Sequence, residues 1–275
     1  MESADLAAAA ADLGERARAQ RPYLEELLQA LVQTESHASQ PAGVDAVGAL
    51  VAEPLERAGF SVERIHKRAS HTAPTWLTDV MLPGHDHNDL GDAWILRRDG
   101  AGARVLILGD LDTAFLPGSS TSFPYTVDGD VARGPGIADA KGGLVVLAGA
   151  IRILEGLGRQ LPSMTVVLSP DEQAGSLFSR PIIEAAAAQS SLCLCLECAR
   201  GGGNLMGARA CCGVGRVTII GREAHAGTDR GAALSAISGF AGVVDAIDGI
   251  TDATAGRFVT VTQVQGGWRR SVVPG

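Results

Sequence analysis

Acidic side chains stand directly after short apolar segments at three places in the chain. They are Asp110 and Asp112 after VLILG, Asp171 and Glu172 after MTVVLSP, and Glu197 after LCLCL. Ligands of open α/β sheets bind beyond the carboxyl ends of the strands, so these five carboxyl groups are expected to converge. Like charges gathered in one cleft repel one another, and a bound divalent cation would relieve that repulsion. The pattern therefore predicts a metal-binding cluster of carboxylates.

A further acid, Asp139, lies in the Gly-rich segment RGPGIADAKGG, just before an expected helix, and we expect it to join the cluster. A structural interpretation stays open for some of these acids, because Asp is a preferred residue at helix N-termini. Asp139 could cap the helix that starts near Lys141, and Asp171 could cap a turn.

Hydrophobic spacing predicts the elements that must position these acids. The expected helices cover 24–32, 44–58, 142–157 and 182–188, and the expected strands cover 60–65, 94–97, 105–108, 164–168 and 192–196. Short apolar strands that alternate with helices are typical of a sheet covered on both faces. The predicted fold class is α/β, with a mostly parallel sheet flanked by helices.

The pattern changes beyond Gly213, which predicts a second and smaller α+β unit. Its expected elements are a strand at 214–220, a Gly- and Ala-rich helix at 232–247 and a strand at 258–264. We place the boundary near residue 212, giving domains at 1–212 and 213–275.

Composition excludes several classes of protein and partner. The 275 residues are 46% hydrophobic and 20% charged, as in ordinary globular proteins, and carry a net charge of −8. Nucleic acid and anionic membranes are therefore poor partners. The apolar run 144–151 is much shorter than the roughly 20 residues that span a bilayer. The acidic N-terminus does not resemble a secretory signal, so we expect a cytoplasmic protein.

Cysteine and histidine patterns offer weaker metal signals. Five cysteines lie between Cys193 and Cys212, an odd number that favours reduced thiols. Cys193 and Cys195 alternate with leucines, which favours burial in the sheet over metal binding. His85 and His87 flank an acid in the segment 70–92, which we expect to be mostly loop. A solvated surface is the favoured interpretation of that pair, so His85→Ala should leave cation binding unchanged.

Seven ordered motifs carry a family resemblance: LVQTESHAS, GDLDTAF, GPGIADAKGG, SPDEQAGS, LECA, GREAHAG and GGWRRSVVPG. Their order and spacing resemble the co-catalytic zinc carboxypeptidase and aminoacylase family, which includes glutamate carboxypeptidase, acetylornithine deacetylase and succinyl-diaminopimelate desuccinylase. The resemblance implies a zinc-exopeptidase-like catalytic domain, of which 1–212 is the first part, with an inserted lid or dimerisation domain. Residues 213–275 would be an incomplete copy of that lid.

The resemblance also implies a set of metal ligands. Asp139 matches the aspartate that bridges two zinc ions, and Glu197 matches a terminal ligand. Asp110 stands where the family has a histidine, Gln173 replaces a glutamate ligand, and a final histidine has no counterpart. The implied site is one weakly held Zn²⁺, Mn²⁺ or Mg²⁺ on Asp110, Asp139 and Glu197, with the harder metals favoured by an all-oxygen donor set.

Other positions match the catalytic and substrate-binding residues of the family. Glu172 matches the general base, and Asp112 matches the acid that orients the neighbouring ligand. His225 matches the lid histidine that steadies the oxyanion, often across a dimer interface. Ser271, preceded by Arg270, stands at a substrate-binding position where asparagine is usual.

The implied function is metal-dependent hydrolysis of an amide or peptide bond in an N-acyl or peptidyl amino acid, of the glutamate carboxypeptidase type. The altered ligands keep a second interpretation open, namely a non-catalytic paralogue that binds a ligand, a carrier protein or a partner chain. Because the family's closing segment is not matched, we also expect a homodimer or a complementing chain.

Overall fold

The computed structural model describes residues 3–67, 75–82, 89–158, 160–199 and 201–275, so the predictions on His85 and His87 lie outside the described residues. The chain divides into two compact units, Met1–Leu205 and Met206–Gly275. The division falls seven residues before the expected boundary. In the described part of the chain, no helix combines the length and the apolar character needed to cross a membrane.

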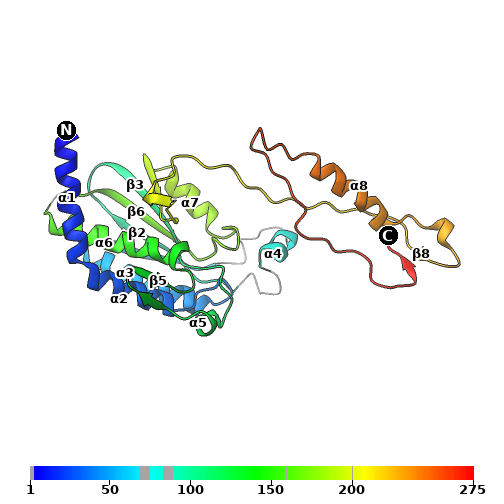
Figure 1. Cartoon of the computed structure of the whole chain (residues 1–275), viewed down its shortest axis with the longest axis horizontal. Helices are drawn as coiled ribbons and strands as arrows, with labels where there is room; N and C mark the ends of the chain where they lie inside the picture. The colour runs from blue at the N-terminus through cyan, green and yellow to red at the C-terminus, as the bar shows by residue number, and fades with distance from the viewer. Residues whose placement is uncertain (1–2, 68–74, 83–88, 159, 200) are drawn as a thin grey trace. The chain divides into compact units, whose positions relative to one another are not determined.

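A five-stranded sheet forms the centre of the first unit (Figure 1). Its strands are β1 (Ser61–Ile65), β2 (Ala93–Arg98), β3 (Ala101–Asp110), β6 (Pro162–Ser169) and β7 (Leu192–Cys195), in the order β1-β2-β6-β3-β7. β3 pairs in parallel with β6 and β7, whereas β2 pairs antiparallel with β1 and β6. The α/β prediction is confirmed.

The sheet is mixed, and it is parallel only around β3. The prediction of a mostly parallel sheet is wrong for β2, which two residues, 99–100, connect to β3. So short a connection reverses the chain, because a parallel crossover needs a dozen or more residues.

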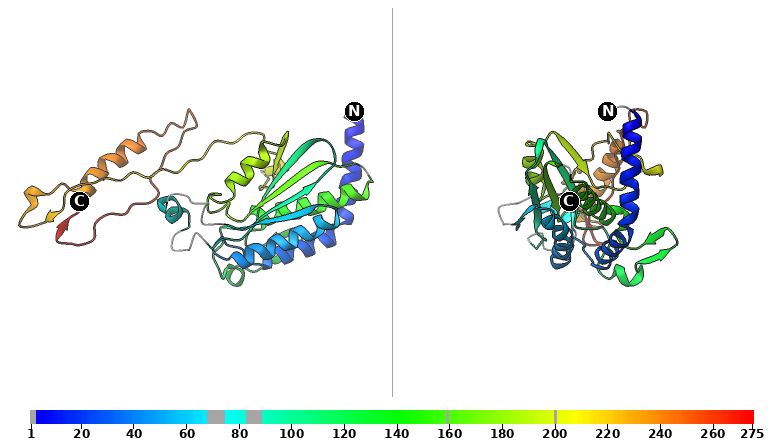
Figure 2. Two further views of the ribbon diagram at one scale, coloured as in Figure 1. Left: turned by 180° about the vertical axis from the view of Figure 1, so that it is seen from behind. Right: turned by 90° about the vertical axis from the view of Figure 1, so that its left-hand side faces the viewer.

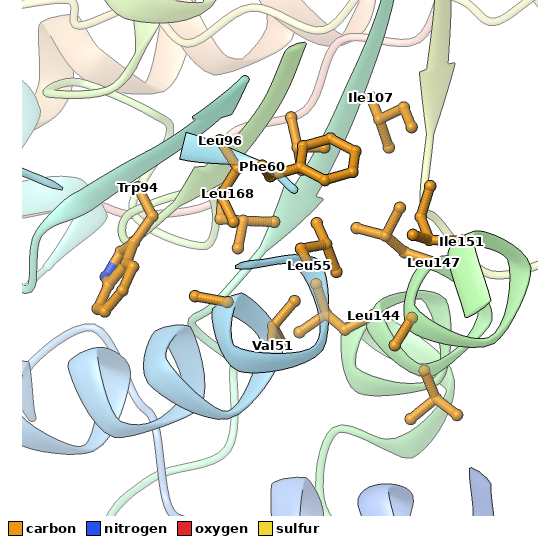
Figure 3. Packing of buried hydrophobic residues seen from close by; sticks show 14 of the residues in the cluster. Val51, Leu55, Phe60, Trp94, Leu96, Ile107, Leu144, Leu147, Ile151 and Leu168 are labelled. Carbon is orange, nitrogen blue, oxygen red and sulfur yellow. The ribbon is translucent and has the colours of Figure 1, made fainter. Parts of the chain in front are cut away.

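Helices cover both faces of this sheet (Figure 2). They are α2 (Arg21–Gln33), α3 (Pro41–Arg57), α6 (Gly142–Gly156) and α7 (Arg180–Ala187), whereas α1 (Ser3–Ala19) packs against α2 and α6. The larger buried cluster joins α2, α3 and α6 to one face, where Leu55 and Leu144 lie against Leu96 and Leu168 (Figure 3). Ile182 and Ile183 of α7 pack against a second buried cluster that includes Leu106.

The sequence of α3 shows why these helices form where they do. Val44, Val47, Val51 and Leu55 recur at helical spacing and are all buried, so one face of the helix packs on the sheet. The chain leaves the helix at Gly59, whose φ of 81° suits glycine.

Small elements connect the main ones. They are α4 (Thr75–Met81), α5 (Ser119–Ser122), the hairpin of β4 (Thr126–Asp128) and β5 (Val131–Arg133), a π-helical turn (Ile137–Lys141) and a 3₁₀ turn (Gly201–Gly203). The helix α4 lies inside the segment 70–92, which the sequence predicts to be mostly loop, and takes up seven of its residues. Its sequence TWLTDVM contains no Gly or Pro and follows Pro74, a residue suited to the first turn of a helix.

β7 departs from its predicted burial. Cys193 and Cys195 are exposed, and so are Leu192 and Leu194. Among the strands that the structure describes, β7 is at the edge of the sheet and pairs only with β3, so one long side of it has no described neighbour. The prediction that the two cysteines pack inside the sheet is therefore wrong.

The second unit contains α8 (Ala236–Asp248), a 3₁₀ turn (Arg230–Ala232) and the antiparallel pair of β8 (Ala224–His225) and β9 (Val272–Val273). Ser235 is the N-cap residue of α8, and its side chain accepts a hydrogen bond from the backbone N–H of Ser238. The predicted strands at 214–220 and 258–264 are wrong, because neither segment takes part in a described ladder. Their apolar residues Ile220 and Phe258 are exposed.

Candidate functional site

Three carboxylates meet at the carboxyl ends of three neighbouring strands. Asp110 ends β3, Glu172 lies on the turn after β6, and Glu197 follows β7. One oxygen from each carboxylate lies within 4.8 Å of the others, and the three residues are buried or partly buried. We call these residues the carboxylate trio. The parallel pairing of β6, β3 and β7 positions them, because it aligns the three strand ends.

Asp112 holds the turn that carries Glu172 of the trio. It is completely buried, and its two carboxylate oxygens accept hydrogen bonds from the backbone N–H groups of Glu172 and Gln173, at 3.0 and 2.9 Å. Burial, followed by the charge of Asp110, raises the pKa of Asp112 well above its ordinary value. Asp112 therefore holds the turn that carries Glu172 against the end of β3.

Asp171 has a structural role. Its buried carboxylate accepts hydrogen bonds from the backbone N–H groups of Phe178, at 2.6 Å, and Ser179, at 3.3 Å, and from the hydroxyl of Ser169, at 3.2 Å. These bonds close the loop that leads into α7. The interpretation of Asp171 as a capping residue is confirmed.

Gln173 lies beside the trio and contacts it as a donor. Its amide nitrogen Nε2 donates a hydrogen bond to Oε2 of Glu172, at 2.8 Å. Gln173 therefore orients Glu172 within the trio.

Asp139 lies on the π-helical turn before α6 and is exposed. The helix N-termini at this turn have no side-chain cap, so the capping interpretation of Asp139 is wrong. Its charge contributes to the raised pKa of Asp110, which places it near the trio, but it is not a member of the 4.8 Å group. The structure thus groups Glu172 with Asp110 and Glu197, where the resemblance implied Asp139.

Lys141 anchors the turn that carries Asp139, a contact that sequence reasoning missed. Its side chain is only 2% exposed, and Nζ donates a hydrogen bond to the carbonyl oxygen of Thr34, at 2.6 Å. Burial lowers the pKa of Lys141 to about 8. The sequence does contain a signal for this contact, because Lys141 directly precedes an apolar helix. A lysine at such a position can turn toward the core, where a charged side chain is unusual and needs a partner.

The electrostatics of the trio suit a cation. Burial is the largest cause that raises the pKa of Asp110 to about 8, and the charges of Glu172, Glu197, Asp139 and Asp171 follow in that order. A divalent ion would offset this crowding of like charges. The donors are all carboxylate oxygens, which Mg²⁺ and Mn²⁺ prefer, so the residues fit a hard divalent metal.

We expect the metal-free protein to lose stability as the pH rises. The pKa of Asp110 is about 8 in the folded chain against an ordinary value of 3.8, so across this interval the folded state holds a proton that the unfolded state releases. The loss of stability caused by Asp110 is absent below the lower pKa and complete above the higher pKa. Melting temperatures measured in EDTA between about pH 5 and about pH 8 should therefore fall, and Asp110→Asn should reduce the fall. Equal slopes for the two proteins would contradict this assignment.

The second unit brings together the other residues that the resemblance singled out. His225 of β8 lies opposite Val272, and the next N–H, that of Ala226, donates to the carbonyl oxygen of Ser271 at 2.9 Å. Nδ1 of His225 accepts hydrogen bonds from the N–H groups of Gly227 and Thr228, at 3.1 and 3.0 Å. The neutral ring therefore carries its proton on Nε2, where it can donate. Arg270 directly precedes Ser271 and is exposed.

Comparison with known proteins identifies relatives of this chain. Carboxypeptidase G2 from Pseudomonas sp. (strain RS-16) is 29% identical over 212 residues, which cover 76% of this chain and 46% of that protein. A tripeptidase from Staphylococcus aureus has a similar structure, with a TM-score of 0.60 and 14% identity, over 91% of this chain and 62% of that one. Aminopeptidase PepT from Bacillus cereus has a TM-score of 0.54 and 17% identity, over 91% and 63%. The two structures share the fold.

This chain spans about half the length of the curated relative that it matches. The model of peptidase family M20/M25/M40 matches residues 106–265, a segment that includes the end of β3, all of β6 and β7, and the three acids of the carboxylate trio. Because this match covers more than half of the chain, the protein belongs to peptidase family M20/M25/M40.

Proposed function

We propose that the protein is a metal-dependent hydrolase of an amide or peptide bond next to an amino-acid carboxylate, of the glutamate carboxypeptidase type. The observation that carries the proposal is the carboxylate trio, in which acids from three strand ends share one small volume. The similarity of the chain to Carboxypeptidase G2 supports the choice of substrate class.

The residues of the trio have distinct tasks in this proposal. Asp110, Glu172 and Glu197 would hold the cation, and the charge of Asp139 acts on Asp110. A bound divalent metal supplies Lewis-acid polarisation of the scissile carbonyl and of the attacking water. Glu172 would accept the proton of an attacking water and return it to the leaving amine. Asp112 keeps Glu172 in place through the two backbone N–H groups that it binds.

Four further residues supply polar groups in this proposal. Gln173 donates to Oε2 of Glu172 and so orients that carboxylate. In the second unit, Nε2–H of His225 supplies a donor suited to an oxyanion, and Ser271 with Arg270 supplies polar groups for a substrate carboxylate.

We expect Glu197→Gln to weaken Mn²⁺ binding by more than the roughly 10- to 100-fold that loss of an outer-shell partner costs. The reason is that a neutral amide replaces one of three charged donors. Isothermal calorimetry with Mn²⁺, Mg²⁺ and Zn²⁺ would measure the change. Asp139→Asn should weaken binding as well, since its charge acts on Asp110. The matched control is Glu184→Gln on the exposed surface of α7, which should bind Mn²⁺ like the wild type.

Hydrolysis assays separate the proposed enzyme from the alternative. N-acyl and peptidyl glutamates incubated with the Mn²⁺- or Zn²⁺-loaded protein should release the free amino acid. The altered family ligands at Asp110 and Gln173 favour the non-catalytic alternative. Tight cation binding without turnover of any of these substrates would support that alternative and would exclude the proposed activity.

A further inference from the structure

Three of the sequence motifs meet at a small cavity that the carboxylate trio does not line. LVQTESHAS supplies Glu35 and Ser36, GDLDTAF supplies Thr113 and Phe115, and GPGIADAKGG supplies Pro135 and Lys141. The backbone joins the first two motifs, because the N–H of Thr113 donates to the carbonyl oxygen of Ser36 at 3.0 Å. The proposed function makes no use of this cavity.

Two buried polar groups that line the cavity have hydrogen-bonding capacity to spare. Ser36 is only 1% exposed, and among the described residues its hydroxyl has no hydrogen-bond partner. Lys141 is equally buried, and in the described part of the chain its ammonium donates one hydrogen bond, to Thr34. An ammonium has three donors, so two remain. Because a buried hydroxyl without a partner is costly, the pair points to a ligand that both groups bind.

The size of the cavity restricts this ligand to one small molecule. The centre of a water-sized sphere can move within about 10 Å³ of it, and one water molecule needs roughly 10 to 15 Å³ by the same measure. Phe115 and Leu116 also line the cavity and are exposed, so these two side chains form its solvent side. A larger organic group would have to displace the buried side chains.

The charges around the cavity favour a neutral ligand. The ammonium of Lys141 supplies a positive charge and the carboxylate of Glu35 a negative one. Hydrogen bonds from the backbone N–H of Gly118, at 2.8 Å, and from the hydroxyl and N–H of Ser120 lower the pKa of Glu35 to about 2, so this carboxylate is ionised at neutral pH. An anion would be repelled by Glu35 and a cation by Lys141, which leaves a neutral polar molecule as the best fit.

We propose that this cavity binds a single ordered water molecule, which accepts a hydrogen bond from Nζ of Lys141 and forms one with the hydroxyl of Ser36. Buried waters make about three hydrogen bonds each, and Glu35 lines the same cavity with a further acceptor. The water connects the segment after α2 with the turn that carries Asp139. The site does not depend on the proposed hydrolase activity.

Crystallography and water relaxation test the site. A crystal structure that resolves ordered waters should show one solvent peak within about 3.2 Å of both Nζ of Lys141 and Oγ of Ser36. In solution, magnetic relaxation dispersion of the water nuclei counts the long-lived internal waters. Ser36→Val removes the hydroxyl and fills the cavity with methyl groups, so it should lower this count by one. The matched control is Ser61→Val on the exposed part of β1, which should keep the count of the wild type.

Three outcomes would overturn the site. The wild-type crystal could show no solvent peak between the two groups, or Ser36→Val could keep every long-lived water. A crystal soaked in bromide could show anomalous scattering in the cavity, which would make it an anion site instead. The wild-type crystal decides the question even if Ser36→Val does not fold, and far-ultraviolet circular dichroism would verify the folding of both variants.

Discussion

Glu172→Gln should lower the rate of amide hydrolysis by about 100-fold or more, the scale of a lost general base. Glutamine keeps the size of the side chain but cannot accept a proton at neutral pH. The backbone N–H of residue 172 would still bind Asp112, so the turn should keep its position. The measurement is kcat for hydrolysis of an N-acyl glutamate at saturating Mn²⁺, because the substitution also removes one charged donor from the trio.

Two controls give this result its meaning. Glu184→Gln changes a glutamate to glutamine on exposed α7 and should leave kcat unaltered. Circular dichroism should show that Glu172→Gln is folded. Full activity of Glu172→Gln at saturating Mn²⁺ would mean that another group acts as the base.

Asp171→Ala should destabilise the first unit by about 2 to 6 kcal/mol, since two backbone N–H groups would lose their acceptor and each buried unsatisfied group costs about 1 to 3 kcal/mol. The N–H groups are those of Phe178 and Ser179, and both residues are buried. The loop into α7 would lose its closing contacts. Urea unfolding followed by circular dichroism would measure the change in the free energy of unfolding.

Glu184→Ala is the matched control for stability. It removes an exposed ion pair with Arg180 on the same helix, and exposed helix pairs of this kind contribute only about 0.3 to 0.5 kcal/mol. If Asp171→Ala were as stable as this control, the hydrogen bonds of Asp171 would have no structural role, and the residue would have to be reconsidered as part of the cation site.

Local sequence patterns determined most of the elements of the first unit. The apolar spacing of α3 and α6 predicted both helices to within a few residues, because helical periodicity depends on residues three and four positions apart in the sequence. The placement of acids after apolar strands likewise predicted that Asp110, Glu172 and Glu197 converge, since parallel strands align their carboxyl ends.

The pairing and the exposure of the strands depend on residues that are far apart in the sequence. The alternation LCLCL predicts a buried strand, yet its burial depends on what packs beside it, and β7 is the edge of the sheet. The apolar segments 214–220 and 258–264 have strand composition, but a strand also needs a hydrogen-bonded neighbour, which these segments lack among the described ladders. Composition carries no information about such neighbours.

The sequence by itself determined the α/β class, the helices α2, α3, α6 and α7, and the set of acids from which a cation site could be made. Only the tertiary structure decided the role of each acid: Asp171 closes a loop, Asp112 holds a turn, and Glu172 joins the trio. The physical reason is that a carboxylate becomes a cap, a support or a ligand according to the donors around it. Those donors come from residues that only the folded chain brings together.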